Sequence, residues 1–133
     1  MGVIATDNNK ITLIYSAENS IGKQTLGYIS SATEDILTID SSKTKITGTQ
    51  WAEIADKLKM DIRDLVDQNH PNFTKEYGDK EVNISNEDCI KVLQNKPETL
   101  AYAILINGND FALIKTPSDV LKHLDTKTNT NNQ

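Results

Sequence analysis

The chain has 133 residues, of which 37% are hydrophobic and 25% are charged, and its formal net charge is −5. That length suits one domain with a core of its own, and the composition is that of a folded globule rather than of a disordered chain. Arg63 is the single arginine among 14 basic residues, which argues against a multi-arginine anion site and against direct binding of nucleic acid.

The few cysteines and histidines limit the chemistry further. Cys89 is the only cysteine, which excludes an internal disulfide, a redox-active cysteine pair and a cysteine-rich zinc site. His70 and His123 lack the spacing of metal ligands, so we expect no metal and no cofactor. Because no apolar run approaches the ~18 residues of a membrane span and residues 2–9 do not resemble a signal peptide, we expect a cytoplasmic protein without membrane contact.

The first third of the chain predicts a strand, a helix and a second strand. Lys10–Ser16 is apolar and rich in β-branched residues, which is typical of a buried strand, and Glu34–Asp40 is expected to form a second strand. Asn19 and Ser20 offer capping side chains for a helix that we expect over Ile21–Ile29. A strand–helix–strand unit predicts two parallel strands joined by a right-handed crossover.

The middle of the chain, about residues 47–95, has the spacing of helices. Thr47 or Thr49 is expected to cap a first helix, and Asp61 a short second one. His70–Pro71 interrupts the pattern, and we interpret His70 as a turn residue. Apolar side chains recur in the first helix at positions i, i+3, i+4 and i+7, namely Trp51, Ile54, Ala55 and Leu58, and we expect Trp51 to be mostly buried.

Further along, Phe73–Gly78 is expected to form a loose turn of helix. Ser85–Asp88 predicts the start of another helix, because acidic residues in a first turn are favoured by the helix dipole. This helix is expected to run to about Asn95 and to end before Pro97.

The last third predicts a hairpin and a helix. Ala101–Ile106 is a buried strand, Asn107–Asp110 has turn chemistry, and Phe111–Lys115 returns antiparallel. Thr116–Asp119 opens the last helix, with a proline at a permitted first-turn position.

The order of these elements predicts an α/β fold with a four-stranded mixed sheet and helices on both faces. This is the thioredoxin-like, or glutaredoxin-like, arrangement with a helical insertion at about residues 47–95. We expect one domain over residues 10–125, a flexible N-terminus at residues 1–9 and a disordered polar tail at residues 126–133.

Four stretches in the right order resemble the thioredoxin-fold arsenate reductases and their relatives, the Spx-type transcription regulators. They are ITLIYSAENSIGKQTL at Ile11–Leu26, KLKMDIRDLV at Lys57–Val66, PETLAYAILING at Pro97–Gly108 and TPSDVLKHL at Thr116–Leu124. The resemblance implies the fold stated above and, for the family, reduction of arsenate coupled to glutaredoxin.

The same resemblance implies that the catalytic residues are absent. The position of the family's catalytic cysteine falls at Asn19 or Ser20, depending on the direction of counting. The arginines that bind arsenate correspond to Asp67, Tyr102 and Thr116, and the proline with a cis peptide bond corresponds to Ala103, where we expect a trans bond.

The remaining candidates each have a structural interpretation and a functional one. Asn19 or Ser20 is expected to cap the first helix, although Ser20 and Lys23 are also candidates for binding an anion. Cys89 is expected to be a small buried hydrophobic residue, with an oxidisable surface thiol as the alternative.

The expected function is therefore binding or regulation without catalysis. The alternative is a glutaredoxin-coupled arsenate reductase or another thiol oxidoreductase. We expect a cytoplasmic protein partner at the helical insertion, bound by exposed Phe73 and Tyr77 and the adjoining loop up to Glu81, because aromatic residues are enriched in binding hot spots. The partner and the oligomeric state stay open.

Overall fold

The computed structural model describes residues 11–30, 36–78 and 84–124. The predicted N-terminal segment 1–9, the predicted tail 126–133 and the loop up to Glu81 lie outside the described residues, as do the first residues of the two strands predicted from Lys10 and Glu34.

A four-stranded mixed sheet forms the centre of the molecule, with the strand order β2-β1-β3-β4. β1 (Ile11–Tyr15) pairs parallel with β2 (Ile36–Asp40) and antiparallel with β3 (Ala103–Asn107), which pairs antiparallel with β4 (Asp110–Ile114). The predicted sheet and its strand directions are confirmed. β1 and β3 are the central strands, and their apolar runs are buried on both faces.

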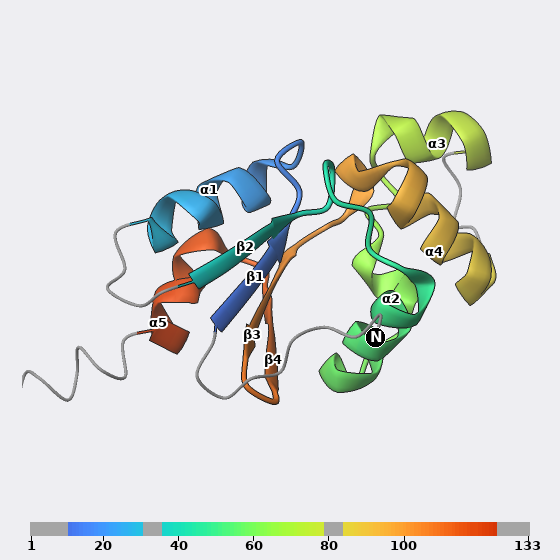
Figure 1. The fold of residues 1–133 in the computed structure, drawn as a ribbon. Helices are drawn as coiled ribbons and strands as arrows, with labels where there is room; N and C mark the ends of the chain where they lie inside the picture. The colour runs from blue at the N-terminus through green and yellow to red at the C-terminus, as the bar shows by residue number, and fades with distance from the viewer. Residues whose placement is uncertain (1–10, 31–35, 79–83, 125–133) are drawn as a thin grey trace, which may run out of the picture.

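One face of the sheet is covered by α1 (Ser20–Ile29), the short 3-10 helix η3 (Pro117–Asp119) and α5 (Val120–Leu124) (Figure 1). The core on this side consists of buried side chains from both strands and helices, including Leu13, Leu105, Ile29 and Leu124. α1 follows β1 directly and returns along the sheet, as a right-handed βαβ crossover requires.

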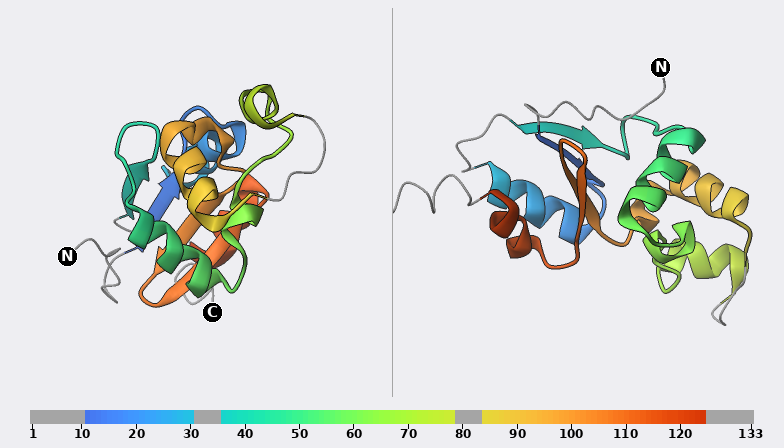
Figure 2. Two further views of the ribbon diagram at one scale, coloured as in Figure 1. Left: turned by 90° about the vertical axis from the view of Figure 1, so that its right-hand side faces the viewer. Right: turned by 90° about the horizontal axis from the view of Figure 1, so that it is seen from below.

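The helical insertion lies at the other side of the sheet (Figures 1 and 2). It consists of α2 (Gly48–Leu58), η1 (Ile62–Leu65), α3 (Pro71–Tyr77), α4 (Asn86–Asn95) and η2 (Pro97–Thr99). Thr47 caps α2 in a capping box with Gln50, which decides between the two predicted caps. Trp51 is 1% exposed, and its predicted burial is confirmed.

The predicted strand Ala101–Ile106 begins two residues later than expected. The backbone before it pairs with the insertion instead of the sheet: the Ala101 N–H donates to the Leu65 carbonyl, and Val66 forms an isolated antiparallel bridge with Leu100. Apolar character alone does not distinguish these two pairing partners. No helix of the described residues is long and apolar enough to cross a membrane.

Candidate functional site

The loop between β1 and α1 contains the position that the resemblance assigns to a catalytic cysteine. Asn19 occupies the capping position of α1, and its Oδ1 accepts hydrogen bonds from the backbone N–H groups of Ile21 (2.7 Å) and Gly22 (3.2 Å). Its Nδ2 donates to the Leu100 carbonyl. The predicted cap is thus confirmed as Asn19, and one amide fills the helix N-terminus and ties it to the insertion.

Ser20 is the first residue of α1 and points outward. Its exposed Oγ accepts a hydrogen bond from Gln24 Nε2 at 2.8 Å, which is a contact within the helix surface. A serine nucleophile needs an adjacent base, and no histidine or carboxylate is bonded to this hydroxyl among the described residues. Lys23 is exposed one turn further along. The predicted anion-binding role of Ser20 and Lys23 stays a prediction.

A second backbone donor in the same loop is also occupied. The Ala17 N–H donates to Asp40 Oδ1 at 3.0 Å, and the same carboxylate accepts from the Ser42 N–H and hydroxyl. Partial burial disfavours the charged carboxylate, but these hydrogen bonds outweigh it and lower the pKa of Asp40. An ionised carboxylate at the end of β2 would repel an anion that approached the loop.

The backbone around Leu100 lies between the cap of α1 and Asp67. The Asp67 N–H donates to the Thr99 carbonyl at 2.7 Å, so Asp67 lies beside the segment that Asn19 contacts. The Asp67 carboxylate accepts from the Asn69 N–H at 3.0 Å and stabilises a local turn. A carboxylate in this place repels an anion, whereas a guanidinium would bind it.

Tyr102, Ala103 and Thr116 complete the set. Tyr102 is half-buried, and Lys115 Nζ lies 5.9 Å from the centre of its ring. Ala103 is fully buried at the start of β3, and the expected trans peptide bond is confirmed because the described part of the chain has no cis bond. Thr116 is exposed and caps the 3-10 helix η3 without a side-chain hydrogen bond.

Cys89 is in the first turn of α4, far from the loop after β1 (Figure 1). Its side chain is fully buried in the core of the insertion, and burial raises the pKa of the thiol to about 11, against the opposing effect of Arg63. The thiol is therefore protonated at neutral pH, and the expected small buried hydrophobic residue is confirmed.

The expected exposure of Phe73 is wrong. Phe73 is 0% exposed, because α3 begins at Pro71 and turns the ring of Phe73 into the core of the insertion. The ring stacks on Tyr77 with centroids 4.8 Å apart. Tyr77 is half-buried, and burial raises the pKa of its hydroxyl. Of the predicted aromatic pair, Tyr77 alone offers accessible surface.

The large apolar side chains that are exposed in the described segments lie elsewhere. They are Leu37, 52% exposed on the edge strand β2, and Tyr28, 40% exposed on α1. Sequence reasoning missed Leu37, because the pattern of Glu34–Asp40 predicts a strand without indicating which of its side chains are exposed. The polar strand residue Thr38 beside it was the available signal for an edge position.

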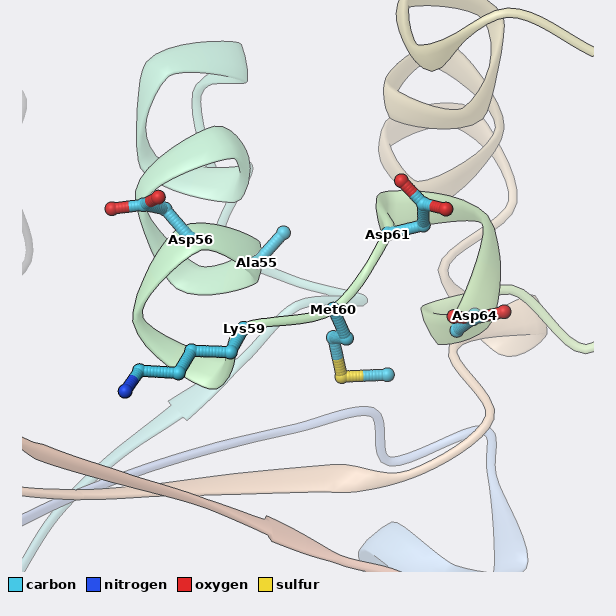
Figure 3. A pocket seen from close by; sticks show the side chains of 6 residues that line it. All are labelled: Ala55, Asp56, Lys59, Met60, Asp61 and Asp64. Carbon is cyan, nitrogen blue, oxygen red and sulfur yellow. The ribbon is translucent and has the colours of Figure 1, made fainter.

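An open depression at the end of α2 is lined by acidic residues. Figure 3 shows Asp56, Asp61 and Asp64 around Met60, with the side chains of Asp56 and Asp64 directed to opposite sides. Within the described residues no group of three or more histidine, cysteine or carboxylate side chains could hold a metal ion. The depression is therefore not a candidate metal centre.

No protein-family model and no curated protein sequence matches the chain. Solved structures do. An arsenate reductase from Vibrio cholerae matches with a TM-score of 0.70 and 13% identity over 85% of this chain and 96% of its own. A putative arsenate reductase from Yersinia pestis matches with a TM-score of 0.70 and 14% identity over 84% and 98%. At these identities the likeness concerns the fold, and this chain has the thioredoxin-like fold with a helical insertion that those arsenate reductases have.

Proposed function

We propose that the chain is a non-catalytic protein with an arsenate reductase-like fold, and that it acts by binding a protein partner as a regulatory module. The observation that carries the proposal is the state of the loop after β1. Asn19 fills the N-terminus of α1 where a thiolate would need free N–H groups, and Asp40 takes up the Ala17 N–H.

The only thiol supports the same conclusion. Cys89 is buried in the insertion with its pKa raised to about 11, so it supplies neither a nucleophile nor an accessible redox group in the native state. The alternative functions, a glutaredoxin-coupled arsenate reductase or another thiol oxidoreductase, both require an accessible thiolate.

A coupled assay tests the absence of catalysis. The protein is mixed with arsenate, glutathione, glutaredoxin and glutathione reductase, and the consumption of NADPH is followed, with the Vibrio cholerae enzyme as the positive control. We expect the rate of the blank for the wild type and for Cys89→Ser. Turnover that Cys89→Ser abolishes would establish the oxidoreductase alternative, and turnover that survives it would contradict the need for a thiol.

A capture experiment tests the binding function. The tagged chain is used to isolate partners from native cytoplasm, and Tyr77→Ala is compared with Tyr28→Ala, which removes an equally large ring from α1. We expect one stoichiometric partner whose recovery falls with Tyr77→Ala and not with Tyr28→Ala. Equal recovery with both variants would remove the insertion from the binding surface, and the absence of any stoichiometric partner would contradict the proposed function.

A further inference from the structure

The shortest of the insertion's α-helices, α3, is attached to the rest of the molecule through few side chains. Its one buried side chain is Phe73. At one end Asn72 Nδ2 donates to Glu98 Oε2 at 2.6 Å, and at the other Glu76 forms an ion pair with Lys96 at 3.3 Å. In Figure 1 this helix lies at the periphery of the insertion, beyond α4.

The N-terminus of α3 is capped by an imidazole. His70 has extended backbone geometry, and its Nδ1 accepts a hydrogen bond from the Asn72 N–H at 3.0 Å. The common capping residues accept through an oxygen atom that stays an acceptor at every pH near neutrality. An imidazole nitrogen accepts only when it carries no proton, so here capping and protonation exclude each other.

We propose that His70 is an acid-sensitive latch at the N-terminus of α3: its neutral ring caps the helix, and its protonation removes the cap and so favours release of the helix. Once protonated, Nδ1 no longer accepts a hydrogen bond, and the ring places a positive charge at the positive end of the helix dipole. Both effects oppose the capped geometry. Imidazole is the side chain whose charge ordinarily changes between about pH 5 and 8.

The charged groups next to the latch or in contact with α3 are two carboxylates and one ion pair. The Asp67 carboxylate accepts from the Asn69 N–H just before His70, and the Glu98 carboxylate binds Asn72. The ion pair of Glu76 with Lys96 lies at the other end of α3.

Release of α3 would also remove a groove. A cavity of about 260 Å³ lies between α3 and α4, with Glu76 and Tyr77 on one wall and Lys91 and Val92 on the other. Because one wall belongs to α3, the groove exists only while α3 is held in place. Mild acidification would thus raise the fraction of molecules in which α3, with Tyr77 and its wall of the groove, is released.

Nuclear magnetic resonance of the folded full chain tests the first step. We expect His70 at pH 7.5 to be the tautomer with its proton on Nε2, with the nitrogen shift of an unprotonated acceptor at Nδ1. His123, which is exposed in α5, provides the internal comparison. A proton on Nδ1 of His70 at pH 7.5 would overturn the proposal.

Hydrogen exchange tests the release. Protection factors of the α3 amides, corrected for intrinsic exchange, are compared at pH 7.5 and 5.5 in the wild type, His70→Asn and His70→Ala. We expect about fivefold lower protection at pH 5.5 in the wild type, the factor that corresponds to a cap of about 1 kcal/mol. His70→Asn keeps a cap that does not titrate, so its protection factors should be the same at both pH values. His70→Ala has no cap, so its protection factors should be low at both pH values. Wild-type protection that is independent of pH, or an equal loss in His70→Asn, would overturn the latch.

Discussion

The helices α1 and α3 both begin at a side-chain cap, but they are held to the molecule in different ways. At α1 the Asn19 amide bonds to two N–H groups of its own helix and to the Leu100 carbonyl, and the backbone of the first turn fits closely against Ser16. At α3 one imidazole makes one bond, and one buried ring supplies the packing. The comparison indicates that α1 depends on backbone fit and α3 on single side chains.

Removal of the buried ring should have the largest effect. Phe73→Ala leaves a cavity beneath α3, and we expect the free energy of unfolding to fall by about 3–5 kcal/mol. Denaturation by urea measures this, with Tyr77→Ala as the control because Tyr77 is half-buried on the same helix. A loss below about 1 kcal/mol for Phe73→Ala would show that α3 does not depend on this ring.

The backbone fit of α1 can be tested with two glycines of one helix. A Cβ at Gly22 would overlap the carbonyl oxygen of Ser16, which is backbone and cannot turn away, whereas a Cβ at Gly27 meets no atom within 4 Å. We expect Gly22→Ala to destabilise by about 3 kcal/mol and Gly27→Ala to stabilise by up to about 1 kcal/mol. Similar thermal midpoints for the two variants would contradict the close approach at Ser16.

Removal of either cap should destabilise the protein less than Phe73→Ala or Gly22→Ala. Asn19→Ala removes the acceptor for two N–H groups and the donor to Leu100, so we expect a loss of about 2 kcal/mol at pH 7.5. His70→Ala removes one hydrogen bond, and we expect about 1 kcal/mol. Chemical denaturation of the two variants measures both losses of stability. A larger loss for His70→Ala than for Asn19→Ala would contradict the expected order of the two caps.

The smallest expected effect concerns Asp40 in the loop beside α1. Its pKa is lower in the folded chain than the ordinary 3.8, so its contribution to stability is complete above that value and is lost as the pH falls through the lower, folded pKa. We expect the free energy of unfolding to fall with acidification below about pH 4 less steeply in Asp40→Asn than in the wild type. Parallel curves for the two proteins would show that the hydrogen bonds from Ser42 and Ala17 do not favour the charged form.

The apolar pattern was sufficient to predict the sheet, and the local chemistry was not sufficient to predict the site. The runs at β1 and β3 identify buried strands because few other structures bury consecutive β-branched residues. Asn19 and Ser20 are both good caps, and the choice of Asn19 depends on the Leu100 carbonyl, 81 residues away. The same limit applies to Phe73, whose burial depends on which face of α3 meets the insertion core.

The interruption of the helical pattern at His70–Pro71 predicts a turn residue at His70. The structure confirms a turn here, since the His70 N–H donates to the Asp67 carbonyl at 3.2 Å, and it adds that Pro71 is the first residue of α3, a position that proline favours, and that His70 is its cap. Histidine is rarely counted among capping residues. The proline therefore indicated a change of structure at this point of the sequence, but the capping role of the imidazole could not be predicted.

The exposed edge of β2 has a consequence for the behaviour of the protein in concentrated solution. β2 contains neither lysine nor proline, the residues that commonly protect an edge, and Leu37 is exposed on it. No other strand in the described part of the chain covers its outer side. Attractive interactions between molecules should therefore dominate at high concentration and appear as a negative second virial coefficient in light scattering, which Leu37→Lys should shift towards positive values.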